Sequence, residues 1–295
     1  MKTQRRSLLY FPSSKAEWYK KLPSYDADVF VFDLEDAVKD TPSSKSYARK
    51  ILLETKKPDC LKEKEFFVRI NSPKTEYFHE DLDAVLSLDP TPDAILLPKV
   101  ESAEDVRKLE TILEHYETIK RISRIEIVPT IETLIGEKNA EEILTSSRRI
   151  TTLQFGENGD YTASYGSIFP LDVIKDPVAN DFLIKILKLA KLYNLLFIDG
   201  IYFKTAENEE DIKELERRCK YIKLLGGNGK GVIHPSQIPI VNEIFSLDTR
   251  DLEEKKKLIE KYERHLSTEG DSAYFKDENV LIGPTYYKQA KRFIR

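Results

Sequence analysis

Eight short apolar runs recur along this chain of 295 residues, with helix-length segments between them. Each run is about as long as a strand and is bounded by polar residues, as expected for strands buried on both faces of a parallel sheet. The runs cover residues 8–11, 29–32, 66–70, 94–97, 125–128, 152–155, 195–198 and 231–234. Apolar residues spaced at the helical period predict helices most clearly over 102–114 and 177–192, with Ser102 as N-cap.

Two α/β arrangements can hold eight such strands: a closed (β/α)8 TIM barrel or an open, doubly wound sheet. The first run is not followed by Gly-x-Gly-x-x-Gly, so dinucleotide binding on an open sheet has no support. A count of eight favours the barrel, and the chain length suits a single barrel. We predict a TIM-barrel catalytic domain over 1–240. The charged, helical pattern beyond it predicts a C-terminal helical extension over 241–295.

Composition excludes several classes of function. A net charge of −4 without a block of like charge argues against nucleic acid as a partner, because phosphate binding needs a concentrated basic face. The two cysteines, Cys60 and Cys219, lie far apart and predict neither a zinc site nor a disulfide framework. The basic N-terminus runs into only a short apolar stretch, so we expect no signal peptide, no membrane partner and a cytoplasmic protein.

Carboxylates gather where the predicted strands end, which is where a barrel enzyme places its chemistry. They follow five of the eight runs, within 33–36, 99–101, 129–132, 156–160 and at Asp199. Unpaired carboxylates at one mouth would repel and raise each other's pKa, and a bound cation would relieve that conflict. Oxygen ligands from one or two carboxylates, with positions open for substrate, suit Mg²⁺.

Arg69 stands on an otherwise apolar run and therefore needs a buried anionic partner or a ligand. Its planar guanidinium suits a carboxylate that binds through both oxygens. A metal and an arginine at one mouth together describe a pocket for a small keto acid. A structural ion pair is the alternative interpretation of Arg69.

A series of ordered segments carries a resemblance that covers almost the whole chain. The most specific is Asp-Leu-Glu-Asp-Ala-Val at 33–38. The others are 7–12, 68–71, 97–102, 131–133, 155–156, 160–166, 198–199 and 233–238. In these segments the chain resembles the citrate lyase beta-subunit family, within the wider group of HpcH/HpaI aldolases, malyl-CoA lyases and citramalyl-CoA lyases.

The resemblance implies a Mg²⁺-dependent carbon–carbon lyase or aldolase. It would cleave or form a 3-hydroxyacyl thioester of the citryl-, malyl- or citramalyl-CoA type, with a keto acid such as oxaloacetate, glyoxylate or pyruvate as partner. By the resemblance, Glu132 and Asp160 are direct metal ligands, and the catalytic residues Glu35 and Asp36 hold the metal's waters. Arg69 is then both catalytic and substrate-binding, because it grips the substrate carboxylate.

The resemblance also implies a homotrimer or hexamer in which the C-terminal extension reaches a neighbouring subunit and supplies a general base. Lys21 matches a lysine that meets CoA phosphates, but Glu17 stands where an arginine is expected. Gly283 stands where the aspartate that acts as general base is expected, so Asp277 or Glu278 is the candidate replacement. An extra residue before Asp160 leaves Glu157 as the alternative second metal ligand.

Those departures keep other functions open. The alternatives are a CoA-independent aldolase, or a non-catalytic barrel that binds a keto acid by itself or as a subunit of a larger assembly. Glu132, Asp160 and Arg69 favour chemistry, whereas Glu17 and Gly283 favour the alternatives.

Overall fold

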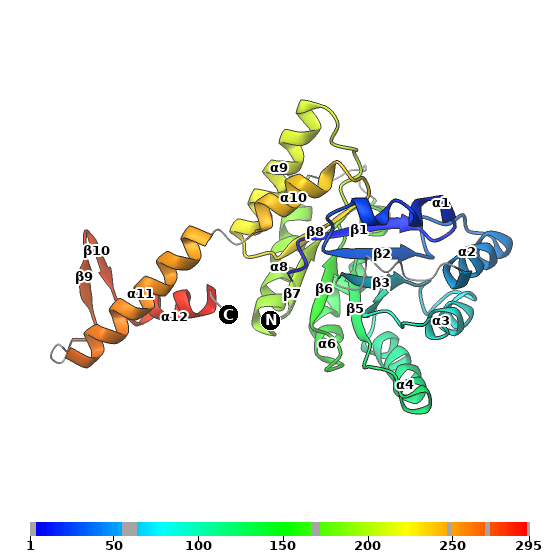
Figure 1. Cartoon of the computed structure of the whole chain (residues 1–295), viewed down its shortest axis with the longest axis horizontal. Coiled ribbons are helices and arrows are strands. Elements are labelled where there is room, and N and C mark those ends of the chain that lie inside the picture. The colour runs from blue at the N-terminus through cyan, green and yellow to red at the C-terminus, as the bar shows by residue number, and fades with distance from the viewer. Residues whose placement is uncertain (1–3, 55–63, 167–171, 247–248, 269–271, 294–295) are drawn as a thin grey trace. The chain divides into compact units, whose positions relative to one another are not determined.

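The structure is a computed structural model, in which residues 4–54, 64–166, 172–246, 249–268 and 272–293 are described. The chain divides into two compact units, Met1–Phe245 and Ser246–Arg295. The first is a closed barrel of eight parallel strands with helices on its outside (Figure 1). The predicted fold is therefore confirmed. Cys60 lies outside the described residues.

The eight strands occur in chain order around the barrel, and the first pairs with the last. They are β1 (Ser7–Pro12), β2 (Val29–Asp33), β3 (Glu65–Arg69), β4 (Ala94–Leu97), β5 (Glu126–Ile131), β6 (Thr152–Phe155), β7 (Leu196–Asp199) and β8 (Gly229–Val232). Leu8 of β1 lies opposite Val29 of β2 on one side and Gly231 of β8 on the other. This pairing leaves the sheet without an edge.

Helices fill the segments between the strands. They are α1 (Ala16–Tyr19), the 3₁₀ helix η1 (Leu22–Ser24), α2 (Pro42–Glu54), α3 (Phe78–Leu86), α4 (Ala103–Lys120), α5 (Leu134–Lys138), α6 (Ala140–Thr145), α7 (Asp160–Tyr165), α8 (Pro177–Leu192), α9 (Glu209–Leu224) and α10 (Gln237–Phe245). The predicted helix over 177–192 is confirmed as α8. Ser102 caps α4 as predicted, in a reciprocal capping box with Asp105. Among the described residues, no helix is both long and apolar enough to cross a membrane.

Alternate residues of each strand point into the barrel, where apolar side chains fill its middle. This interior cluster consists of Leu8, Tyr10, Val29, Val31, Phe67, Ala94, Leu96, Val128 and Ile198. At the N-terminal ends of the strands, Arg5 pairs with Glu65 and Glu126, each at 2.7 Å, over the ring of Phe67. A polar cluster and an apolar layer thus occupy the bottom and the middle of the barrel, which leaves the opposite mouth for a ligand.

The second unit contains α11 (Thr249–Thr268), a hairpin of β9 (Phe275–Asp277) and β10 (Val280–Ile282), and α12 (Pro284–Phe293). The rings of Tyr262 and Tyr287 stack 4.7 Å apart and join α11 to α12. The sequence pattern predicts a purely helical extension and misses the hairpin, because the hairpin's strands are very short and its turn lacks glycine. Glu278 takes the left-handed conformation that the turn requires, with φ at 50°.

The boundary between the units follows Phe245, five residues beyond the predicted end of the barrel domain at 240. The reason is α10, whose Val241 and Phe245 are buried in the same core as the barrel helices.

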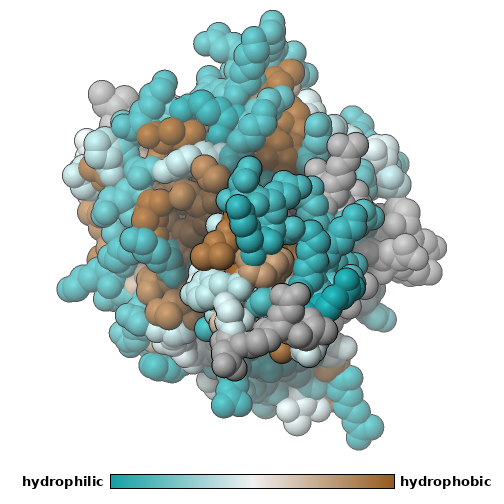
Figure 2. All heavy atoms as spheres, turned by 90° about the vertical axis from the view of Figure 1, so that its left-hand side faces the viewer, coloured by the Kyte–Doolittle hydropathy of each residue, from teal (hydrophilic) through white to brown (hydrophobic). Residues whose placement is uncertain are grey.

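Figure 2 shows a mixed surface, with hydrophobic patches between hydrophilic side chains.

Candidate active site

Arg69, at the end of β3, pairs with Asp33, its partner in register at the end of β2. Its Nε and Nη2 donate to the two carboxylate oxygens of Asp33 at 2.8 and 2.5 Å. Nη1 lies 3.1 Å from Glu35 Oε2, and the guanidinium lies over the ring of Tyr10. Both members of the Arg69–Asp33 pair are buried. The arginine therefore has a buried anionic partner, which fixes its plane and leaves Nη1 as the nitrogen that Asp33 does not engage.

Asp33 also organises the loop that carries the acidic residues. Its carboxylate accepts hydrogen bonds from the backbone N–H groups of Glu35 and Ala37, at 2.8 and 3.1 Å. The buried ammonium of Lys45 donates to the carbonyl oxygens of Leu34 and Glu35, at 2.9 and 2.8 Å. Sequence reasoning did not assign Asp33 or Lys45 a role. The register of β2 against β3 would have indicated Asp33, whereas no sequence signal marks Lys45.

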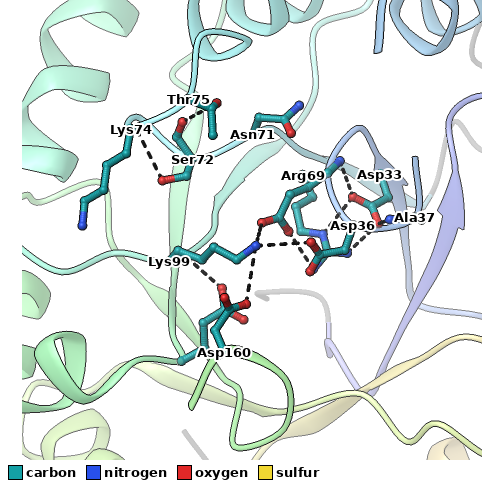
Figure 3. Close-up of polar contacts among 12 residues, drawn as sticks. Asp33, Asp36, Ala37, Arg69, Asn71, Ser72, Lys74, Thr75, Lys99 and Asp160 are labelled. Carbon is teal, nitrogen blue, oxygen red and sulfur yellow. Dashed lines mark hydrogen bonds and ion pairs between the residues drawn. The ribbon is translucent and has the colours of Figure 1, made fainter. Parts of the chain in front are cut away.

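The ammonium of Lys99 lies among three carboxylates, two on the loop after β2 and one at the start of α7 (Figure 3). Its Nζ is 2.8 Å from Glu35 Oε1, 3.2 Å from Asp36 Oδ1 and 3.4 Å from Asp160 Oδ2. Partial burial alone would lower the pKa of Lys99, but these carboxylates raise it above its ordinary value. Lys99 thus brings together three of the predicted site residues, although sequence reasoning gave it no defined role.

Glu132 follows β5 and is buried beside the same cluster. Its Oε1 accepts a hydrogen bond from the backbone N–H of Lys99 at 2.8 Å. A side chain at Gly156 would crowd it, because a Cβ there would lie 3.2 Å from Glu132 Oε2. Burial, together with repulsion from Glu35, raises the pKa of Glu132 to about 8. Additional positive charge near this carboxyl would stabilise its ionised form.

The donors at this mouth fit Mg²⁺ in their chemistry. Among the described residues, no group of three or more His, Cys, Asp or Glu side chains could hold a metal by itself. Mg²⁺ does not need such a group, because it commonly takes one or two carboxylates and keeps several waters. Glu132 supplies a buried carboxyl with a raised pKa. Asp160, at the start of α7, supplies one that is partly exposed and open to water.

Glu157 belongs to a different cluster. Its Oε1 accepts hydrogen bonds from Arg218 and, at 2.6 Å, from Asn158. Arg218 also donates to both oxygens of Asp199 at 2.7 Å, and Lys230 donates to Asp199 at 2.6 Å. These buried groups form what we call the wall cluster, Glu157, Asp199, Arg218 and Lys230. Its contacts favour Asp160 over Glu157 as a ligand at the mouth.

Lys21, which is expected to meet CoA, and Glu17, which stands in place of the expected arginine, lie in exposed positions. Lys21 precedes η1. A surface hollow of about 370 Å³ lies in the loops after β1 and β2 and on α2. Its lining residues are Ser14, Lys15, Val38, Lys39, Ser43, Ser44 and Tyr47. Two lysines and three hydroxyl-bearing serines give this hollow donors suited to phosphate.

The candidate bases lie in the second unit. Asp277 pairs through both oxygens with Lys261, at 2.9 and 2.8 Å, and Glu278 occupies the hairpin turn. Gly283 packs against Tyr274 so closely that a Cβ at this position would overlap the tyrosine ring.

Comparison with known proteins gives consistent matches. Residues 6–235 match the family model described as HpcH/HpaI aldolase/citrate lyase. A (3S)-malyl-CoA thioesterase of Cereibacter sphaeroides is 32% identical over 88% of this chain and 85% of its own length. The human mitochondrial citramalyl-CoA lyase is 29% identical over 98% of this chain and 84% of its own. The structure of a citrate lyase beta subunit from M. tuberculosis, complexed with oxaloacetate and magnesium, is 25% identical. It aligns with a TM-score of 0.68 over 83% of this chain and 98% of that chain.

Proposed function

Because this chain belongs to the HpcH/HpaI aldolase/citrate lyase family and is a lyase, we propose that it cleaves or forms a 3-hydroxyacyl-CoA thioester with a keto acid as partner. One observation carries the proposal: a buried arginine, fixed by Asp33, lies beside a cluster of carboxylates at the open mouth of the barrel. Relatives named for malyl-CoA and citramalyl-CoA support the thioester. The related structure with oxaloacetate and magnesium supports the keto acid and the metal.

In this proposal Arg69 and the acidic residues divide the work. Nη1 of Arg69 binds the substrate carboxylate, and Asp33 holds the guanidinium in place for it. Glu132 and Asp160 would hold Mg²⁺, with Glu35 and Asp36 on its waters. The metal supplies Lewis acidity for the keto-acid oxygens when it is bound.

In the cleavage direction a base removes the proton of the substrate hydroxyl. The electrons of the carbon–carbon bond pass to the thioester as an enolate while the hydroxyl carbon becomes the keto group. The enolate is then protonated on carbon, so atoms and charges balance. We assign the base to Asp277 or Glu278 of a neighbouring subunit in a trimer or hexamer. Exposed apolar side chains on the hairpin, Val280 and Leu281, support a contact of this unit with another surface.

The CoA phosphates would contact Lys21 and the hollow that Lys15 and Lys39 line. The exposed carboxylate of Glu17 does not supply the positive charge that a phosphate needs. The lysines of the hollow provide positive charge on the same rim of the barrel, next to the loop that carries Glu35.

The test is an assay with malyl-, citramalyl- and citryl-CoA, in which keto acid and free thiol are measured separately. We expect keto acid and acyl-CoA products in the presence of Mg²⁺, and none after chelation or in Glu132→Gln. The matched control is Glu101→Gln at the end of the neighbouring strand, which should retain activity. Thiol without keto acid would identify thioester hydrolysis and refute carbon–carbon cleavage. Oxaloacetate binding without cleavage of any thioester would instead favour a CoA-independent aldolase or a non-catalytic barrel.

A further inference from the structure

Lys99 is connected to both proposed metal ligands, through different parts of the residue. Its backbone N–H donates to Glu132 Oε1 at 2.8 Å, and its ammonium lies 3.4 Å from Asp160 Oδ2. The same ammonium also pairs with Glu35 and Asp36. In Figure 3 the side chain extends from its loop directly into the acidic cluster. Lys99 therefore already places one positive charge beside Asp160, one of the two carboxylates that would bind the cation.

The backbone of Lys99 shows that this placement is built into the loop. Its φ is 52°, in the left-handed region that residues other than glycine rarely adopt. Such a conformation persists where the surroundings hold it, and the hydrogen bond to Glu132 does so here. The side chain is about a quarter exposed, so it has a solvent-facing side towards which it can move.

We propose that Lys99 is an internal competitor of the divalent cation, whose ammonium must withdraw from Asp160 when the metal binds. The proposal rests on the metal site of the proposed function but concerns the affinity of that site for its cation. Arg69 lies against Asp33 and Glu35, so Lys99 is the cation that lies beside Asp36 and Asp160. Metal binding then trades one cation for another, which sets a threshold of metal concentration for loading the site.

The test is Mn²⁺ binding to the substrate-free protein, followed by the loss of the free-ion signal in electron paramagnetic resonance. Lys99→Met removes the charge, and we expect the Kd for Mn²⁺ to fall at least tenfold. The Kd for Mg²⁺, measured by displacement of Mn²⁺, should fall by a similar factor. The magnitude follows because the variant has neither to break the ion pairs of Lys99 nor to keep a unit positive charge roughly 4 Å from a divalent ion. The matched control is Lys74→Met, which removes the same charge from the same rim. Lys74 pairs with Glu101 and points away from the cluster in Figure 3. The Kd of the Lys74→Met variant for Mn²⁺ should therefore differ from that of the parent by less than about twofold.

Lys99→Asn is the second variant, because asparagine tolerates the left-handed conformation better than methionine. Circular dichroism first checks that each variant is folded. An unchanged or weaker Mn²⁺ affinity in the folded variants would overturn the competitor. Absence of Mn²⁺ binding in the parent and in both variants would overturn the competitor and the metal site together. Tighter binding in the variants, with no thioester cleaved by the parent, would uphold the competitor and refute only the proposed reaction.

Discussion

Replacement of Asp199 by asparagine tests the wall cluster, because it removes one charge with little change in shape. Asp199 accepts two hydrogen bonds from Arg218 and one from Lys230, and the three side chains are buried. The asparagine oxygen can still accept a hydrogen bond, but Arg218 keeps Glu157 as its carboxylate partner and Lys230 keeps only the carbonyl oxygen of Gly200 and the neutral amide. Removing one partner of a buried pair typically costs about 3–5 kcal/mol of the free energy of unfolding.

The pH dependence gives a second measure. Burial alone would raise the pKa of Asp199, but Arg218 and Lys230 lower it from 3.8 to about 2. Because the pKa of Asp199 is lower in the folded than in the unfolded protein, its ionised carboxylate stabilises the fold. This stabilisation is complete above about pH 4 and is lost as pH falls towards 2. It contributes roughly 2–3 kcal/mol to the free energy of unfolding. The asparagine variant should therefore lose less stability than the parent over that acid range.

Urea unfolding of the parent and Asp199→Asn measures both effects. With an m-value of about 3 kcal/mol/M, the midpoint of the barrel transition should fall by roughly 1–1.7 M at pH 7. Asp181→Asn on the exposed side of α8 is the matched control, because it makes the same change of charge at the surface and should leave the midpoint in place. A loss below about 1 kcal/mol at neutral pH, or equal acid sensitivity of parent and variant, would refute the account of the wall cluster.

Three further predictions concern the mouth and the second unit. Arg69→Lys should weaken oxaloacetate binding at least tenfold by calorimetry, since a lysine cannot pair with both oxygens of Asp33 and still offer a fixed third donor to the ligand; normal binding by a much less stable protein would make Arg69 purely structural. Asp160→Asn should weaken Mn²⁺ binding while Glu157→Gln mainly lowers the melting temperature, and the opposite pattern would exchange their roles. Truncation after Phe245 should reduce turnover by ~10²–10⁴-fold while metal binding persists, because it removes the proposed base; undiminished turnover would place the base in the barrel. Conversely, an aspartate restored at position 283 should raise turnover. This variant needs Gly283→Asp combined with Tyr274→Ala, because a side chain at position 283 would overlap the tyrosine ring.

The barrel could be predicted from sequence because strand length, strand number and alternation with helices are local patterns that the closed sheet preserves. Side-chain direction at the strand ends was harder. Ile198 points into the barrel, so the next residue, Asp199, must face the helices. The same alternation separates Gly156, which contacts Glu132, from Glu157 in the wall cluster. The expectation that Asp199 and Glu157 lie at the mouth was therefore wrong, because alternation turns both carboxylates towards the helices.

The role of Lys99 could not be predicted in this way. Its side chain reaches the acidic cluster because the backbone takes a left-handed conformation directly after β4. Strand alternation does not extend into such a loop, and a lysine carries no sequence signal for positive φ. The proposed roles of Arg69, Glu35, Asp36, Lys21, Glu132 and Asp160 stay predictions until binding and activity are measured.

The pairing of β1 with β8 also has a consequence for synthesis of the chain. About 220 residues separate the end of β1 from the start of β8, so the first strand cannot acquire its second neighbour until the barrel is nearly complete. At ~5–20 residues per second, one edge of β1 waits roughly 10–45 s on the ribosome. During that time the unpaired backbone of a strongly apolar strand is open to pairing with other nascent chains. Synthesis of β8 and its pairing with β1 thus end the period in which aggregation is most favoured.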